Sequence, residues 1–132
     1  MSSIALSIPG LPPINTASSR GSHWAFAKLK RKWESHVCAA VLTTLGRWPD
    51  KPLTRALVTI TRCSASEPDY DNLVQGGKFL LDGLIKAGVI VDDSPAVIGR
   101  PEYRWQQAAP GAGSVRIQVE DASVEIGERV PA

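Results

Sequence analysis

The chain has 132 residues, of which 43% are hydrophobic and 21% charged, and its formal net charge is +2. This composition fits an ordinary globular protein, and the length fits one domain over residues 1–132. The charge does not by itself indicate a nucleic-acid partner, and Cys38 and Cys63 lack the spacing of a zinc site or a disulfide scaffold.

No apolar run approaches the about 20 residues that a membrane-spanning helix needs. The N-terminal residues also lack the basic and apolar regions of a signal peptide. We therefore expect a cytoplasmic protein.

The first predicted strand covers residues 3–8, where apolar side chains alternate, and it stops at Pro9-Gly10. Two prolines then hold residues 11–16 in an extended form. Asn15 in this segment is a candidate to bind phosphate or to orient a catalytic group. Its alternative role is to hydrogen-bond its own loop.

A long helix is predicted next, capped by Ser22, beginning near His23 or Trp24 and ending at Gly46. Apolar residues recur along it at helical spacing and form one stripe. Its opposite face carries the basic residues Lys28, Arg31 and Lys32. Such a face is either simply solvated or in contact with phosphate.

The middle of the chain predicts a strand over residues 53–63 and a second helix from Lys78 to Gly88. Gly76-Gly77 costs about 1 kcal/mol per glycine in a helix, so residues 73–77 are expected to be irregular. Residues 89–91 read as a short buried extended run.

The last third of the chain predicts β-structure. Residues 96–105 are expected to form one strand-like segment, and residues 115–119 alternate as a half-exposed strand, the two making a hairpin. From about residue 122 the pattern is weak, which indicates an irregular tail or an extra edge segment. The order β-α-β-α-β-β predicts an α+β fold, a single small mixed sheet with two helices packed on it.

Carboxylates gather at both ends of the second predicted helix. Asp69 and Asp71 would point to one side if their segment is extended, and one of Asp92 and Asp93 could face the same pocket. Mutual repulsion makes such a cluster costly unless a cation or basic side chains neutralise it, and Mg²⁺ is a cation that prefers oxygen ligands. The alternative is that these are ordinary turn sequences, where aspartate is common.

Lys78 also has two readings. It stands four residues before Asp82, as in an ordinary helix ion pair. It could instead direct its ammonium into the carboxylate cluster and stabilise charge on a phosphate. Composition does not decide between them.

The segment Pro68-Asp69-Tyr70-Asp71-Asn72-Leu73, followed by the run from Lys78 to Asp92-Asp93, resembles the signature of the RusA family of Holliday junction resolvases. The Leu11-Pro12-Pro13-Ile14-Asn15 segment is similar to the proline-rich start of that family. The resemblance is specific over residues 68–93. It implies a RusA-like fold.

By this resemblance, Asp69, Asp71 and Asp93 match the metal-binding acidic positions and Lys78 the catalytic lysine. In the family the lysine follows Asp-x-Asp-Asn closely, whereas here residues 74–77 intervene. If the family pattern is aligned on Asp82, Lys78 takes the position of the catalytic lysine. If it is aligned on Asp71, Gln75 takes that position. We prefer Lys78 because the glycines can absorb an insertion.

Asp82 and Asp92 are second-tier candidates for the metal site. Asp82 would be a helix partner of Lys78 or Lys86, and Asp92 would either support the metal ligands from behind or point outward. The resemblance implies a Mg²⁺-dependent endonuclease, with Mn²⁺ as a substitute, that resolves four-way DNA junctions by paired nicks. It also implies a homodimer and an association with phage or prophage.

The candidate DNA-binding residues are, besides Asn15, mostly basic. They are Arg20, Lys28, Arg31, Lys32, Arg100 and Arg104, with Arg55 and Arg116 as further positions. Two alternatives remain from the residues alone. One is a junction-binding module that does not cleave, and the other is a nuclease for other branched DNA such as flaps.

Overall fold

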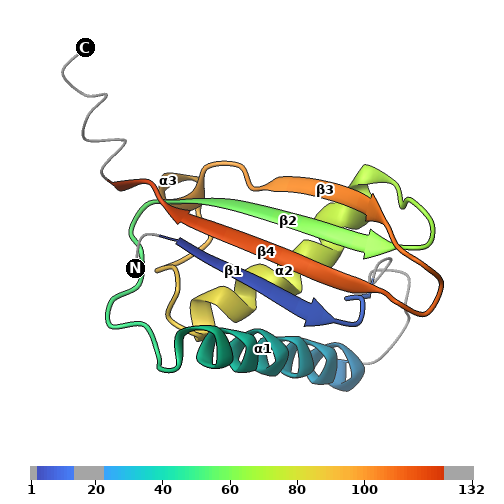
Figure 1. The fold of residues 1–132 in the computed structure, drawn as a ribbon. Helices are drawn as coiled ribbons and strands as arrows, with labels where there is room; N and C mark the ends of the chain where they lie inside the picture. Colours follow the sequence, from blue (N-terminus) through green and yellow to red (C-terminus); the bar gives the residue numbers. More distant parts are fainter. Residues whose placement is uncertain (1–2, 14–22, 124–132) are drawn as a thin grey trace, which may run out of the picture.

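In the computed structural model, which describes residues 3–13 and 23–123, four strands form one mixed sheet (Figure 1). The strands are β1 (Ser3–Pro9), β2 (Ala56–Ser64), β3 (Glu102–Gln107) and β4 (Ser114–Asp121). Their order across the sheet is β1-β4-β2-β3. β4 runs antiparallel to both of its neighbours, and β3 runs parallel to β2. The expected α+β class, with one mixed sheet and helices packed on it, is confirmed.

The predicted hairpin of the last two strands is wrong. β3 and β4 follow each other in the chain, but β2 lies between them in the sheet. A parallel β2–β3 pair needs a long crossover, and the helix after β2 supplies it. The alternating burial along β4 shows that one face of the sheet is covered, but it does not indicate which strand pairs with β4.

Residues 95–98 form the short helix α3 (Pro95–Ile98), so the prediction of a strand-like segment there is wrong. Ser94 precedes it as the N-cap residue, and Pro95 occupies the first turn. Proline is well tolerated there, because the N–H groups of the first turn have no hydrogen-bond partner within the helix. This local signal for a helix start outweighs the apolar, β-prone side chains that follow it.

Helix α1 (His23–Leu45) extends over the predicted range and ends as expected at Gly46. Gly46 has a φ of +74°, and its N–H donates to the carbonyl of Leu42 at 2.8 Å. Glycine is suited to this left-handed helix terminus. The apolar stripe of α1 buries Trp33, Val37 and Val41.

Helix α2 (Tyr70–Lys86) begins eight residues earlier than predicted and includes both glycines of the Gly76-Gly77 pair. A Cβ at Gly77 would overlap the ring of Tyr103, and one at Gly83 would come within 2.6 Å of the Val37 Cβ. The glycines therefore let α2 approach β3 and α1 closely. Tertiary packing overrides their low helix propensity.

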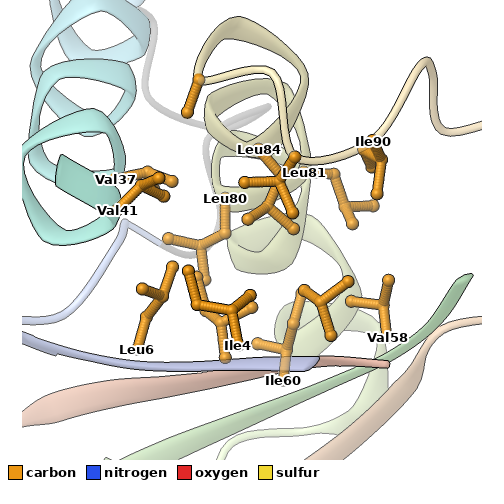
Figure 2. Close-up of a cluster of buried hydrophobic side chains, with 14 of the residues drawn as sticks. Ile4, Leu6, Val37, Val41, Val58, Ile60, Leu80, Leu81, Leu84 and Ile90 are labelled. Atoms are coloured by element: carbon orange, nitrogen blue, oxygen red, sulfur yellow. The ribbon is translucent and has the colours of Figure 1, made fainter. Parts of the chain in front are cut away.

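One core cluster lies between the sheet and the two long helices (Figure 2). The inner face of the sheet supplies Leu6 and Ile60, which meet Val37 of α1 and Leu80 and Leu84 of α2. The opposite face of the sheet has no helix over it in the described part of the chain (Figure 1). Neither α1 nor any other described helix is long and apolar enough to cross a membrane.

Candidate active site

Four polar side chains lie along one face of α2. Asp71, Gln75, Lys78 and Asp82 are spaced four, three and four residues apart, which places them on one side of an unbroken helix. We call these four residues the polar stripe. At a rise of about 1.5 Å per residue the stripe extends for about 16 Å. Because the glycines are helical, they do not absorb the three-residue shift between Gln75 and Lys78, and Lys78 lies one turn beyond Gln75 on the same face.

Asp93 reaches the stripe from a different part of the chain. Its carboxylate accepts a hydrogen bond from the Lys78 ammonium at 2.8 Å, and the two side chains are 27% and 63% exposed. The segment before Asp93 is held by a parallel bridge between Leu53 and Ile90. This bridge fixes the position from which Asp93 meets the helix. The hydrogen bond to Asp93 raises the pKa of Lys78.

Tyr103 of β3 stands beside this ion pair. Its ring meets that of Tyr70 edge-on, with centroids 6.2 Å apart. Burial raises the pKa of the Tyr103 hydroxyl, as do Tyr70 and Asp93, while Lys78 opposes them. The hydroxyl therefore stays protonated at neutral pH and can donate a hydrogen bond. Sequence reasoning missed Tyr103, because only the parallel pairing of β3 with β2 brings it here.

Asp82 marks the point where the stripe meets α1. Burial raises the pKa of its carboxyl, while Lys78 and Lys30 lower it and Asp93 and Glu34 raise it further. Lys30 also pairs with Glu34 at 3.8 Å on α1. Lys30 was not among the predicted site residues, although it belongs to the basic run on which the DNA-contact prediction rests.

Asp69 and Asp71 do not share an extended segment, so that premise of the predicted cluster is wrong. Asp69 is the N-cap residue of α2 with extended backbone angles, whereas Asp71 is helical and lies in the first turn. The Asp69 carbonyl accepts hydrogen bonds from the N–H groups of Asn72 and Leu73, but its side chain makes no capping hydrogen bond. An aspartate at this position normally caps with its carboxylate. The Asp69 carboxylate is therefore not used for that structural role.

Asp92, in contrast, has a clear structural role. Its carboxylate accepts a hydrogen bond from the Ser94 N–H at 2.8 Å, which is the aspartate turn that sequence reasoning gave as the alternative. Hydrogen bonding to Ser94 lowers the Asp92 pKa. The side chain is exposed and leads the chain into α3, so of the two roles left open for Asp92 the structure shows the outward carboxylate.

Within residues 3–13 and 23–123, no three acidic, histidine or cysteine side chains stand close enough together to hold a metal ion. Asp93 is paired with Lys78, and Asp69 and Asp71 lie at the N-terminal end of α2. The donor set is nevertheless all oxygen, and Mg²⁺ commonly takes one or two carboxylates with water filling the other positions. The chemistry of the donors fits Mg²⁺, and a three-carboxylate arrangement is not what the structure shows.

The predicted DNA contacts divide between two faces of the molecule. Lys28, Arg31 and Lys32 are exposed on α1, whereas Arg104 lies on the uncovered face of the sheet. Arg104 pairs with Glu102 at 2.9 Å, and there it shares a depression of about 560 Å³ with Arg116.

Two of the remaining predicted contacts lie within the described residues. Arg55 and Arg100 are exposed. Asn15 and Arg20 lie outside the described residues.

Sequence comparison leaves the family open. No protein-family model matches this chain, and no curated protein matches it. The likeness to the RusA resolvases therefore rests on the motif residues alone, and the functional statements that follow from it are proposals.

Proposed function

We propose that the protein is a Mg²⁺-dependent, structure-selective DNA endonuclease of the RusA type that resolves four-way junctions. The observation that carries this proposal is the Lys78–Asp93 ion pair at 2.8 Å. The two residues are fifteen positions apart and belong to the two halves of the motif that resembles the family. Their contact brings the lysine and an acidic residue of that motif to one point on the surface.

Asp69, Asp71 and Asp93 are the residues that would hold one or two Mg²⁺ ions, and a site shared by all three requires Asp93 to leave Lys78 and approach the N-terminal end of α2. When bound, Mg²⁺ would polarise the scissile phosphate and activate a water molecule for in-line attack, giving 5′-phosphate and 3′-hydroxyl ends. Lys78 keeps its positive charge at neutral pH, because its pKa is raised from an already high value. Its ammonium can stabilise the negative charge that builds on the phosphate, and the protonated Tyr103 hydroxyl can donate to the same oxygens.

Junction resolution requires two symmetric nicks, so the proposal includes a two-fold homodimer with one site per subunit. Exposed basic residues of α1, with Arg100 and Arg104, would contact phosphates of the junction arms without reading sequence. The cytoplasm and a phage or prophage origin remain part of this proposal.

A second candidate function is a junction-binding protein that does not cleave. It is favoured by the extra helical turn that separates Lys78 from Asp71, and by the lack of a three-ligand cluster in the described residues. This protein would keep the basic residues and the fold while the displaced lysine leaves the site incomplete.

The decisive experiment is the cleavage of a synthetic four-way junction with and without Mg²⁺ or Mn²⁺, beside a flap and a linear duplex. We expect paired symmetric nicks with the natural protein, and a loss of at least a hundredfold in Asp71→Asn and Asp93→Asn. Asp92→Asn is the matched control, since an asparagine oxygen can still accept the Ser94 N–H. Its activity should stay within about twofold of the natural protein.

The other outcomes are equally informative. Tight junction binding without cleavage in either metal would establish the binding protein, and faster cleavage of flaps would establish a different branched substrate. Lys78→Met and Gln75→Lys test the register of the lysine. Inactivation by Lys78→Met would identify Lys78 as the working lysine, and unchanged cleavage would remove it from the mechanism. If Gln75→Lys restores cleavage to the inactive Lys78→Met protein, a lysine one turn earlier reaches the same phosphate.

A further inference from the structure

The uncovered face of the sheet places two arginines in one row. Arg104 of β3 and Arg116 of β4 are both in register with Thr61 of β2, which lies between them. Ser7 of β1 is in register with Arg116. We call these four residues the arginine row. Side chains alternate between the two faces of a strand, and the neighbouring Ile117 is buried in the core, so the row faces away from the helices.

The positive charge of the row is only partly balanced. The row lines the depression of about 560 Å³, and none of the described residues that line this depression is acidic. Arg116 donates to the neutral amide oxygen of Gln106 at 3.3 Å. Arg104 pairs with Glu102, but the two side chains are 59% and 56% exposed, and such a pair contributes little. Since two strand spacings of about 4.8 Å separate the arginines, an anion placed between them would be attracted by both.

The polar side chains of this depression can donate hydrogen bonds to phosphate. An arginine guanidinium presents its N–H groups in a planar fork that matches two phosphate oxygens. Serine, threonine and glutamine side chains donate to phosphate oxygens without reading the bases. The neutral donors that line the depression are Ser7, Thr59, Thr61, Gln106 and Gln118. Both kinds of donor fit the backbone of a nucleic acid.

The aromatic residue next to Arg104 in the chain does not add a stacking surface to the row. Trp105 alternates with Arg104 along β3, and its indole N–H donates to the buried Ser64 Oγ at 3.0 Å. Proteins that bind single strands stack the bases on aromatic side chains. The row therefore fits the phosphates of a duplex better than it fits a single strand.

The sheet separates the arginine row from the polar stripe. On β3, Tyr103 contacts the α2 layer at Gly77, whereas the next residue, Arg104, belongs to the uncovered face. Figure 1 shows both long helices on one side of the sheet. A straight duplex that lies against the polar stripe would therefore not reach the row. Any duplex on the row is a different segment.

We propose that the arginine row binds the phosphate backbone of a DNA duplex segment other than the one at the polar stripe. A phosphodiester occupant follows from the charge and the donors of the row, whereas the choice of DNA rests on the proposed function. A branched substrate offers two such segments at once, because its arms leave the branch point in different directions. The row would thus favour branched over linear DNA by joining two contacts in one complex.

The test measures binding of a labelled four-way junction, and of one of its arms as a linear duplex, by fluorescence anisotropy. EDTA is present, so that cleavage does not contribute, and the salt concentration is varied. In the double variant Arg104→Gln, Arg116→Gln, we expect the junction affinity to fall at least tenfold at about 100 mM salt. The slope of log affinity against log salt should become shallower by about two, since two phosphate contacts are lost. The preference for the junction over the linear duplex should fall at least fivefold, because one of the two joined contacts is gone.

Two matched controls separate the row from total charge. Arg47→Gln removes an arginine that is likewise exposed and paired, in this case with Asp50 at 3.6 Å, and it should change the affinity by less than about twofold. Thr61→Glu places a carboxylate between the two arginines and should weaken junction binding as much as the double variant does. Thr54→Glu makes the same change at an exposed residue away from the row and should not. Urea unfolding of all these variants identifies any that fail to fold.

The proposal is overturned if the folded double variant keeps the natural affinity and salt slope, or keeps the natural preference for the junction. It is also overturned if Arg47→Gln causes an equal loss. Displacement of the junction by poly-glutamate as effectively as by unlabelled DNA would overturn it too, since the row would then bind an acidic protein segment equally well.

Failure of the nuclease proposal is a separate result. A protein that binds junctions through the row but never cleaves them would uphold the row and remove the proposed activity. Metal-dependent cleavage by the natural protein, together with unchanged junction binding in the double variant, would keep the activity and remove the row.

Discussion

The two sides of helix α2 use the same backbone for different purposes. One side buries Leu73, Leu80 and Leu84 with the glycines that let the helix approach α1 and β3. The other side carries the polar stripe, whose ion pair with Asp93 is largely exposed. The buried side fixes the fold, and the exposed side holds the chemical groups at positions that the fold determines.

This difference predicts that substitutions on the two sides of α2 have different effects on stability and on cleavage. Changes on the buried side should alter the free energy of unfolding by several kcal/mol, because they create cavities or overlaps. Changes on the stripe should alter it by less than about 1 kcal/mol, while cleavage changes strongly if the proposed function holds. All stability measurements should use one protein concentration, since association contributes to apparent stability.

The largest expected effect is that of Leu80→Ala. Leu80 is fully buried at the centre of the core, and removing its side chain leaves a cavity that the neighbours fill only in part. We expect a loss of about 2–5 kcal/mol in urea unfolding followed by tryptophan fluorescence. Gln75→Ala, on the opposite side of the same helix, should change stability by less than about 0.5 kcal/mol. Equal losses of stability in Leu80→Ala and Gln75→Ala would contradict the difference between the buried and exposed sides of α2.

The next effect is that of Gly83→Ala. Alanine favours a helix over glycine by about 1 kcal/mol, but here its Cβ would lie 2.6 Å from the Val37 Cβ. Moving α1 away from α2 costs about 1–3 kcal/mol as overpacking, so we expect a net loss despite the better propensity. The same urea experiment decides the sign. Since alanine at position 37 would keep the overlapped Cβ, the partner change is Val37→Gly, and a combined loss smaller than the sum of the two single losses would identify the overlap as the cause.

A smaller effect is expected from the Lys78–Asp93 pair. In a double-mutant cycle with Lys78→Met and Asp93→Asn, the coupling energy should be about 0.2–1 kcal/mol, the range of solvent-exposed pairs. The pKa of Lys78 is raised above its ordinary 10.5, so this contribution is complete below pH 10.5 and is lost as the pH rises through the raised value. If the coupling energy stays unchanged well above that pH, it does not arise from the charge of Lys78.

Sequence reasoning predicted those parts of the fold that depend on local patterns. The extent of α1 follows from its apolar stripe and from Gly46, which the left-handed terminus requires. The alternation in β1 and β4 likewise identified both strands and their buried sides. These signals are complete within about ten residues of chain.

What sequence reasoning missed depends on long-range contacts. Gly77 is helical because Tyr103 occupies the space beside it, and nothing near position 77 indicates that ring. The partner of β3 is chosen by the crossover through α2, so the hairpin predicted from adjacency was wrong. For the same reason, the motif could suggest the contact of Lys78 with Asp93, but spacing along the chain could not establish it.

The smallest stability effect is expected from Asp82→Asn. The Asp82 carboxylate belongs to α2 and interacts electrostatically with Lys30 and Glu34 of α1 as well as with Lys78. Burial raises the pKa of Asp82 above its ordinary 3.8, so the ionised side chain is held less well in the folded protein than in the unfolded chain. Asparagine has a similar shape and no charge. At pH 7 we therefore expect Asp82→Asn to be as stable as the natural protein or slightly more, within about 0.5 kcal/mol.

The pH dependence sharpens this prediction. The stabilising contribution of a carboxyl with a raised pKa is complete below the unfolded value of 3.8 and is lost as the pH rises through the folded value. Any advantage of the asparagine should thus disappear when urea unfolding is repeated below pH 3.8. A clear loss of stability at pH 7 would instead mean that attraction to Lys78 and Lys30 outweighs burial. Asp82 would then belong with the residues that hold α1 and α2 together.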